Sequence, residues 1–254
     1  MWWSSSPTPS SSMSMAEWLT ATGHSIEEPV PSLFTFNLPG NAITKLMGIT
    51  VEDVRIRITG TKLEEQGPVL ITHWGLSGPA ILRLSAWGAR ELAGRNWAFR
   101  ITVNWLPGFS EQSLKERFQA LRFDLAAQKL YGKNPLGLPN RLWDYFLQQS
   151  EAKEDTRWAD MPALIQNKLV KLICAGEYEV KGKTTFKEEF VTAGGIRLSE
   201  VDPQTMMSKK QPGLYFAGEI LDVDGVTGGF NFQHAWTSGW IAGSSIATAS
   251  QVPD

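Results

Sequence analysis

The strongest constraint on the fold is a block of strand patterns followed by a block of amphipathic helix patterns. Within residues 48–59, Val54, Ile56 and Ile58 alternate with polar residues, which is the period of a half-buried strand. Residues 97–105 repeat this alternation with larger aromatic side chains. We expect further short strands over residues 32–38, 69–72, 177–180, 186–193 and 195–198. The strand patterns before residue 108 therefore predict a β-rich domain, and further short strands follow after residue 176.

Helix patterns are concentrated in the middle of the chain. Among the strands, Ser77 is the expected N-cap of a helix that has Pro79 in its first turn. After residue 108, Ser110 is expected to cap a helix with an inward stripe of Leu114, Phe118, Leu121 and Leu125. A second helix is expected over residues 140–149. Asp160 is the expected N-cap of a third, whose inward residues are Leu164, Ile165, Leu169, Leu172 and Ile173. A strand cluster followed by a small helical bundle predicts the α+β class.

Charge and composition argue against several classes of function. The 254 residues carry 24 Lys and Arg against 26 Asp and Glu, a formal net charge of −2. Proteins that grip nucleic acid or anionic membranes need a basic surface. The lone Cys174 allows neither an internal disulfide nor a thiolate cluster, and the 3 histidines are too widely spaced for a metal site. We therefore expect no metal, no nucleic-acid partner and no membrane association.

The N-terminal residues 1–15 form a Ser/Pro-rich low-complexity stretch, which we expect to be disordered. They lack the basic and apolar regions of a secretory signal. The longest mostly apolar stretch, residues 236–249, is shorter than the roughly 20 residues that a bilayer requires. With one cysteine and no export signal, the expected location is cytoplasmic.

The segment of residues 213–243 holds the strongest indication of a ligand site. It predicts a buried strand over residues 214–217, Glu219 at its carboxyl end, a glycine-rich loop over 222–229 and a helix over 230–249. Ligands of open α/β sheets bind at the carboxyl ends of strands, and a helix N-terminus presents free N–H groups. The alternative interpretation is a strand–turn–helix corner whose glycines only make the turn. The residues alone leave both interpretations open.

Four stretches carry a resemblance to a known family: PSLFTF at residues 31–36, THWGLSGPAIL at 72–82, VTAGGI at 191–196 and FAGE at 216–219 with the loop that follows it. In this order they closely resemble the BaiN-like family of NAD(P)- and FAD-dependent oxidoreductases. The resemblance covers about residues 16–249. It implies an inserted β-barrel-like domain plus a small helical bundle, followed by the C-terminal strand–loop–helix piece of an FAD-binding α/β domain.

The resemblance also implies which residues bind the cofactor FAD. Glu219 stands where many members carry Asp, and in such flavoproteins this acid contacts the ribityl chain. The backbone at the start of the last helix faces the pyrimidine edge of the isoalloxazine. The implied cofactor-binding residues are Gly218, Glu219, Asp222, Thr227, Gly228, Gly229, Asn231 and Gln233.

One part of the family pattern is absent from this sequence. Members begin with a βαβ unit whose GxGxxG loop holds the FAD pyrophosphate, and no GxGxxG occurs here. The resemblance therefore implies a tail over residues 1–15, a residual segment of the FAD domain over 16–31, an inserted domain over 32–187 (barrel 32–108, helical 109–187) and the C-terminal part of the FAD domain over 188–254.

The expected function is the C-terminal portion of an FAD-dependent oxidoreductase. In the complete enzyme, NAD(P)H would reduce the flavin, which would reduce a small organic molecule. Two alternatives stay open: a non-catalytic truncated module that does not bind FAD alone, and one half of a split flavoenzyme. His73 is a candidate catalytic residue, with a half-buried structural histidine as its alternative, whereas Cys174 and His234 are expected to pack.

Overall fold

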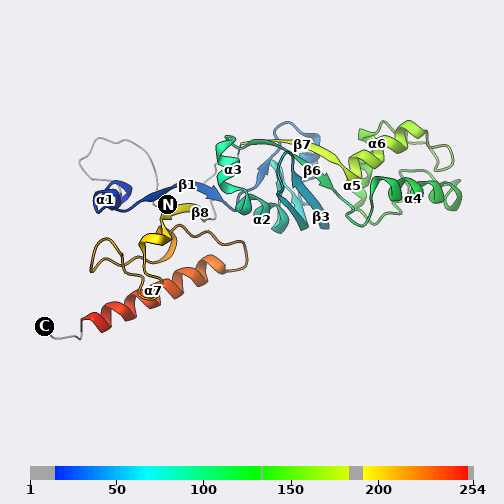
Figure 1. The fold of residues 1–254 in the computed structure, drawn as a ribbon. Helices are drawn as coiled ribbons and strands as arrows, with labels where there is room; N and C mark the ends of the chain where they lie inside the picture. The colour runs from blue at the N-terminus through cyan, green and yellow to red at the C-terminus, as the bar shows by residue number, and fades with distance from the viewer. Residues whose placement is uncertain (1–14, 133, 183–190, 251–254) are drawn as a thin grey trace. The chain divides into compact units, whose positions relative to one another are not determined.

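A computed structural model of the chain describes residues 15–132, 134–182 and 191–250. The chain divides into two compact units (Figure 1). The barrel unit is Phe34–Glu188, and the terminal unit combines Met1–Leu33 with Glu189–Asp254. Each unit is described by itself below.

The barrel unit is built on a six-stranded antiparallel sheet with the order β2-β5-β4-β3-β6-β7. The edge strands β2 and β7 contact each other, so the sheet nearly closes into a barrel and confirms the expected α+β class. Its strands are β2 (Phe36–Asn37), β3 (Thr50–Ile58), β4 (Glu64–Ile71), β5 (Gly75–Ser77), β6 (Ala98–Asn104) and β7 (Gly176–Lys181).

Buried and exposed side chains alternate along β3, and the buried ones line the barrel interior. Val54, Ile56 and Ile58 are fully buried, whereas the intervening arginines are exposed. The β3–β4 register shifts between Val51 and Val54, and such a bulge increases the bend and twist of a strand. The 3₁₀ helix η1 (Ala42–Leu46) precedes β3. The curved sheet therefore wraps around its own apolar face.

The sequence predicts one helix from Pro79 to about Ala93 after β5, and the structure differs from this at the N-cap and at Gly88. Ser77 is not the N-cap, because it pairs with Leu70 as the last residue of β5. Gly78 occupies the cap position at φ +100°, and α2 (Pro79–Trp87) begins with the expected proline. Gly88 then separates α2 from α3 (Ala89–Gly94), so the expected single helix is two.

The helical part of the barrel unit consists of α4 (Glu111–Asp124), α5 (Asn140–Gln149) and α6 (Ala163–Cys174). The predicted Ser110 cap and the 140–149 helix are confirmed. Asp160 is not the cap of α6, since Pro162 takes that position, and Leu164 is exposed rather than inward. Gly176 begins β7 two residues after α6 ends.

The terminal unit is smaller and has little core. It contains α1 (Met15–Ala21), the antiparallel pair β1 (Ile26–Ser32) and β8 (Val191–Ile196), the 3₁₀ helices η2 (Leu198–Glu200) and η3 (Gly218–Ile220), and α7 (Phe230–Ala249). Its buried apolar cluster is Leu19, Ile196, Val201, Phe216 and Leu221. The helix predicted over residues 230–249 is confirmed with both its ends.

Three predicted strands fail or change in the structure. The run 32–38 is broken at Leu33, whose φ of 54° lies outside the extended region. Residues 214–217 form no strand, because only Tyr215 makes an isolated bridge and only Phe216 is buried. The stretch 195–198 divides between the end of β8 and the start of η2. The expected strand at 186–193 lies partly outside the described residues.

A buried histidine joins the end of α1 to the loop before η3. His24 is 3% exposed. The Ser208 hydroxyl oxygen accepts the backbone N–H groups of Lys210 (3.0 Å) and Gln211 (2.9 Å), which leaves its proton for His24 Nε2 at 2.7 Å. His24 Nδ1–H is then the donor to the Thr22 hydroxyl at 2.8 Å. This accounting assigns one neutral tautomer to the ring.

An ion pair reinforces the same turn. Lys210 Nζ lies 2.6 Å from Glu200 Oε1 and also donates to the Gly23 carbonyl at 2.7 Å. Burial opposes ionisation of Glu200, but hydrogen bonds from Lys210 and Ser25 outweigh it and lower the pKa of this carboxyl to about 2. The turn between α1 and β1 is therefore fastened by side chains almost 200 residues later in the chain.

Candidate functional site

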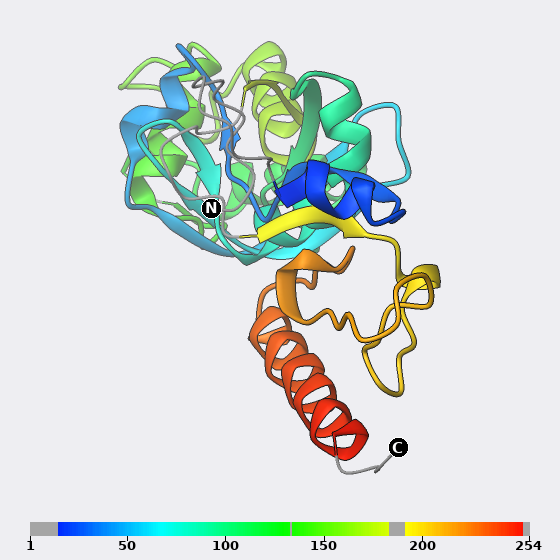
Figure 2. The same cartoon turned by 90° about the vertical axis from the view of Figure 1, so that its left-hand side faces the viewer.

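The candidate site lies where β8 meets η3 and the start of the glycine loop that follows it (Figure 2). Ile196 pairs in parallel with Leu221, and its carbonyl accepts the Asp222 N–H at 2.9 Å. Gly195 permits this approach, because a Cβ there would lie only 2.4 Å from the Ile220 carbonyl oxygen. Its φ of +128° also favours glycine. The backbone of the VTAGGI stretch, residues 191–196, is therefore the surface against which residues 220–222 pack.

Two hydrogen bonds fix the position of η3. The exposed carboxylate of Glu219 accepts the Thr192 backbone N–H at 2.9 Å, which ties η3 to β8. The Gly218 N–H donates to the hydroxyl of Ser238 at 2.9 Å, and this hydroxyl donates to the His234 carbonyl at 2.7 Å. Glu219 and Gly218 are thus held between β8 and α7, and Glu219 keeps acceptor capacity toward solvent.

The glycine loop is closed by an amide bridge. Asn231 Oδ1 accepts the Gly225 N–H at 2.7 Å, and Asn231 Nδ2 donates to the Gly225 carbonyl at 2.9 Å. On the same loop, the buried Ser32 hydroxyl donates to Asp224 at 2.8 Å. The loop therefore has a defined shape set by contacts within the terminal unit.

The two residues before α7 are glycines, and the ring of Phe230, the first residue of the helix, lies 3.5 Å from the position of a Cβ built on Gly228. Gly229 occupies the N-cap in the left-handed region at φ +86° and supplies no side-chain cap, and Gly228 precedes it at φ +116°. Both glycines are exposed, and Thr227 is half-buried. The exposed Gln233 donates to the Thr237 hydroxyl at 2.9 Å. An uncapped helix N-terminus offers N–H donors and partial positive charge to a ligand.

The structure thus gathers the predicted residues between 218 and 233 within the terminal unit, whereas His73 belongs to the barrel unit. His73 is exposed at the turn between β4 and β5, with its ring centroid 3.9 Å from that of Trp74. The Thr72 hydroxyl accepts the Gly75 N–H at 3.1 Å and holds the turn. His73 is therefore accessible rather than half-buried.

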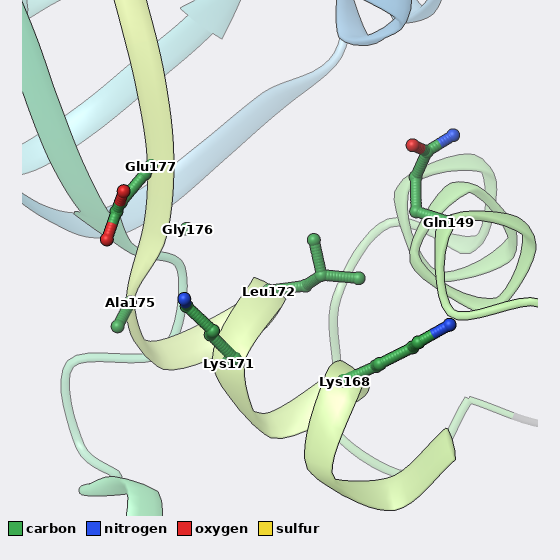
Figure 3. Close-up of a pocket in the computed structure, with 7 residues that line it drawn as sticks. All are labelled: Gln149, Lys168, Lys171, Leu172, Ala175, Gly176 and Glu177. Carbon is green, nitrogen blue, oxygen red and sulfur yellow. The ribbon is translucent and has the colours of Figure 1, made fainter. Parts of the chain in front are cut away.

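Two other features of the barrel unit provide no competing chemistry. Burial, aided by the nearby Glu111, raises the pKa of Cys174 to about 11, so this thiol is a poor nucleophile. A hollow of about 300 Å³ lies between α5, α6 and β7 (Figure 3). Its lining includes Lys168, which pairs with Glu151 at 2.8 Å, and none of the predicted site residues.

Sequence reasoning missed the residues that position the site. Ser238, Ser32 and Thr192 hold Gly218, Asp224 and Glu219 respectively. A serine among small residues of the last helix was the available signal, because a small helix face permits close backbone approach. The partner strand of Glu219 had no local signal, since it lies 27 residues earlier.

The fold and the site define a barrel-and-helix domain joined to a strand–loop–helix segment. Residues 30–191 match the family described as "HI0933-like protein barrel and H2TH domain". The chain belongs to this family of flavoproteins, which confirms the resemblance.

Curated relatives agree with this assignment. The chain is 32% identical over 211 residues to a protein from Escherichia coli named ribosomal RNA dihydrouridine synthase, covering 80% of this chain and 48% of that protein. It is 26% identical over 229 residues to the 3-dehydro-bile acid delta(4,6)-reductase of Clostridium scindens, covering 89% and 55%. A Haemophilus influenzae protein with the first name is 29% identical over 215 residues, covering 84% and 50%. The chain spans about half the length of these relatives.

Proposed function

We propose that this chain provides the flavin-facing portion of an FAD-dependent oxidoreductase. The observation that carries the proposal is the N-terminus of α7, which follows Gly228 and Gly229, has no side-chain cap and lies beside a loop whose shape is set by the Asn231–Gly225 hydrogen bonds. Membership of a flavoprotein family supports the choice of ligand.

The residues present fit one end of FAD. A flat ring can lie against glycine backbone: a Cβ built on Gly229 meets nothing within 4 Å, and beside Gly228 the neighbouring side chain is the aromatic ring of Phe230. The pyrimidine edge of a flavin carries carbonyl oxygens, for which first-turn N–H groups are suitable donors. The Glu219 carboxylate suits the hydroxyls of the ribityl chain. The GxGxxG loop that would hold the pyrophosphate is absent from the sequence.

The chain's own residues would bind and orient rather than react. When bound, FAD supplies hydride transfer between a reduced nicotinamide such as NAD(P)H and an organic substrate. The backbone at Thr227, Gly228 and Gly229 would hold the ring, and Asn231 would hold the loop that carries Asp222. The partial positive charge of the α7 N-terminus would stabilise negative charge on the pyrimidine edge.

The names of the relatives indicate a substrate class. A delta(4,6)-reductase of a 3-dehydro compound saturates carbon–carbon double bonds conjugated to a carbonyl group. Dihydrouridine differs from uridine by saturation of the ring double bond next to a carbonyl. We propose that this protein's substrate also contains such an activated double bond.

A chimera tests the proposal. We would replace the matching region of the Escherichia coli relative by this chain, purify the product and record its visible spectrum. A bound flavin band that NAD(P)H bleaches is expected. Glu219→Ala should weaken flavin retention, whereas Glu177→Ala, on β7 of the barrel unit, is the matched control. A folded chimera that binds no flavin contradicts the proposal.

The second candidate is one half of a split enzyme, which the partial coverage of the relatives favours. Co-purification of this chain with a separately encoded GxGxxG protein would establish it. The expected absence of a nucleic-acid partner stays a prediction, because two relatives are named for ribosomal RNA. Reduction of free uridine but not of ribosomal RNA would support a small-molecule substrate.

A further inference from the structure

The last helix has an apolar face that the described structure leaves uncovered. Phe232, Trp236 and Trp240, spaced four residues apart, are 69%, 70% and 77% exposed, and we call them the aromatic face. The rings of Phe232 and Trp236 stack with centroids 6.1 Å apart. Ser238 and Ala242 are the buried residues of the helix. Because the angular step is about 100° per residue, these two point roughly opposite to the aromatic face.

The sequence of α7 is that of a helix covered on both sides. Its 20 residues include no Lys, Arg, Asp or Glu. A surface helix normally carries charges on its outer face, and α7 carries none. Exposed tryptophans in a continuous stripe mark an interaction surface.

The sheet of the same unit is incomplete as well. Among the described residues, β1 and β8 form a two-stranded sheet to which β8 adds one isolated bridge, from Ile196 to Leu221, and such a pair is marginally stable by itself. The relatives are about twice as long as the region that this chain matches. An additional polypeptide of that size can supply further strands beside β1 and β8, and it can also supply an apolar layer over α7.

We propose that the aromatic face of α7 is the docking surface for a polypeptide equivalent to the unmatched half of the relatives. The proposal rests on the proposed function, since that half would complete the flavin domain. Its contact with α7 is made by apolar side chains packed on Phe232, Trp236 and Trp240.

Radical footprinting of tryptophan side chains tests the proposal without reference to flavin. The isolated chain and the Escherichia coli chimera are labelled in parallel. Labelling of Trp236 and Trp240 should fall several-fold in the chimera, while the control Trp87, 64% exposed on α2, keeps its rate. The labelling rates of Trp236 and Trp240 do not depend on bound cofactor. A chimera that protects these tryptophans but binds no flavin would therefore overturn the proposed function and leave the docking proposal standing.

Three results would overturn the docking proposal. Equal labelling in the two proteins shows that the face stays open. Protection in the isolated chain that grows with concentration, together with a doubled mass, identifies a second copy as the occupant. Concentration-independent protection in the monomeric isolated chain shows that the chain covers its own face.

A double variant, Trp236→Ser with Trp240→Ser, provides a second measurement should the chimera not fold. It should leave the unfolding midpoint of the isolated chain unchanged, because these rings contact little there. A large destabilisation of the isolated chain would also overturn the proposal.

Discussion

The amide bridge between Asn231 and Gly225 allows a quantitative test of the loop geometry. Asn231→Ala removes both of its hydrogen bonds, of 2.7 and 2.9 Å. A typical hydrogen bond contributes about 0.5–1.5 kcal/mol net, so the loop should lose about 1–3 kcal/mol. Because 1.4 kcal/mol corresponds to a factor of ten, the Gly225 amide should exchange roughly 5- to 140-fold faster with solvent.

Asn231→Asp separates the two hydrogen bonds. The aspartate keeps an acceptor for the Gly225 N–H and adds charge near the α7 N-terminus, which is favourable there. It loses the donor to the Gly225 carbonyl. We therefore expect Gly225 exchange close to wild type in this variant, unlike in Asn231→Ala.

Amide exchange followed by NMR is the assay, with Gln233→Ala as control because its side chain contacts only the surface Thr237. Unaltered Gly225 exchange in Asn231→Ala would refute the reasoning, since the loop would then be held by other contacts. Equal acceleration in the alanine and aspartate variants would show that the acceptor bond contributes nothing.

Three further predictions concern stability and reactivity. The pKa of Glu200 is about 2 in the folded protein and about 4.3 in the unfolded chain, so the carboxylate stabilises the fold above about pH 4.3 and this stabilisation is lost as the pH falls toward 2. Glu200→Gln should therefore reduce the loss of stability between pH 7 and pH 3, measured by urea titration. Equal pH dependence in wild type and variant would contradict the assignment. Gly195→Ala should destabilise the terminal unit by more than about 2 kcal/mol, because its Cβ would meet the Ile220 carbonyl oxygen at 2.4 Å. A Cβ built on Gly239 meets nothing within 4 Å, so Gly239→Ala should instead stabilise α7 by about 0.5–1 kcal/mol. Urea titration at pH 7 measures both glycine variants. Cys174, with its pKa raised to about 11, should resist a thiol reagent at pH 8 until the protein unfolds, and rapid labelling of the folded chain would disprove its burial.

Local patterns predicted those elements whose stabilising contacts are also local. The helix at 140–149 and the Ser110 cap were readable because helical periodicity and capping act within a few residues. The barrel strand around Val54 was readable because one of its faces is buried.

Sequence patterns failed to predict the structure where contacts with residues distant in the chain determine it. The apolar run at residues 214–217 has no neighbouring strand in the described structure, so its bridge at Tyr215 remains isolated. Leu33 adopts positive φ where the chain passes between the two units, which no periodicity signals. The sequence does not separate the fully buried tryptophans, such as Trp105, from the exposed ones, such as Trp240.

The candidate site combines local shape with an incomplete ligand-binding surface. The hydrogen bonds that shape it among the described residues lie inside the terminal unit, so we expect the folded unit to keep this local geometry in the isolated chain. A missing pyrophosphate loop would then reduce affinity without altering this end of the site. Because this sequence has no GxGxxG loop to bind the nucleotide end of FAD, we expect riboflavin to bind the isolated chain as tightly as FAD does.

Quenching of flavin fluorescence measures both affinities. A preference for FAD of more than about tenfold would require about 1.4 kcal/mol from its nucleotide end and would contradict the argument. Binding of neither flavin would favour the non-catalytic module. Loss of riboflavin binding in Glu219→Ala, but not in Glu177→Ala, would tie the binding to this site, because the Glu219 carboxylate is the acceptor positioned by the Thr192 N–H.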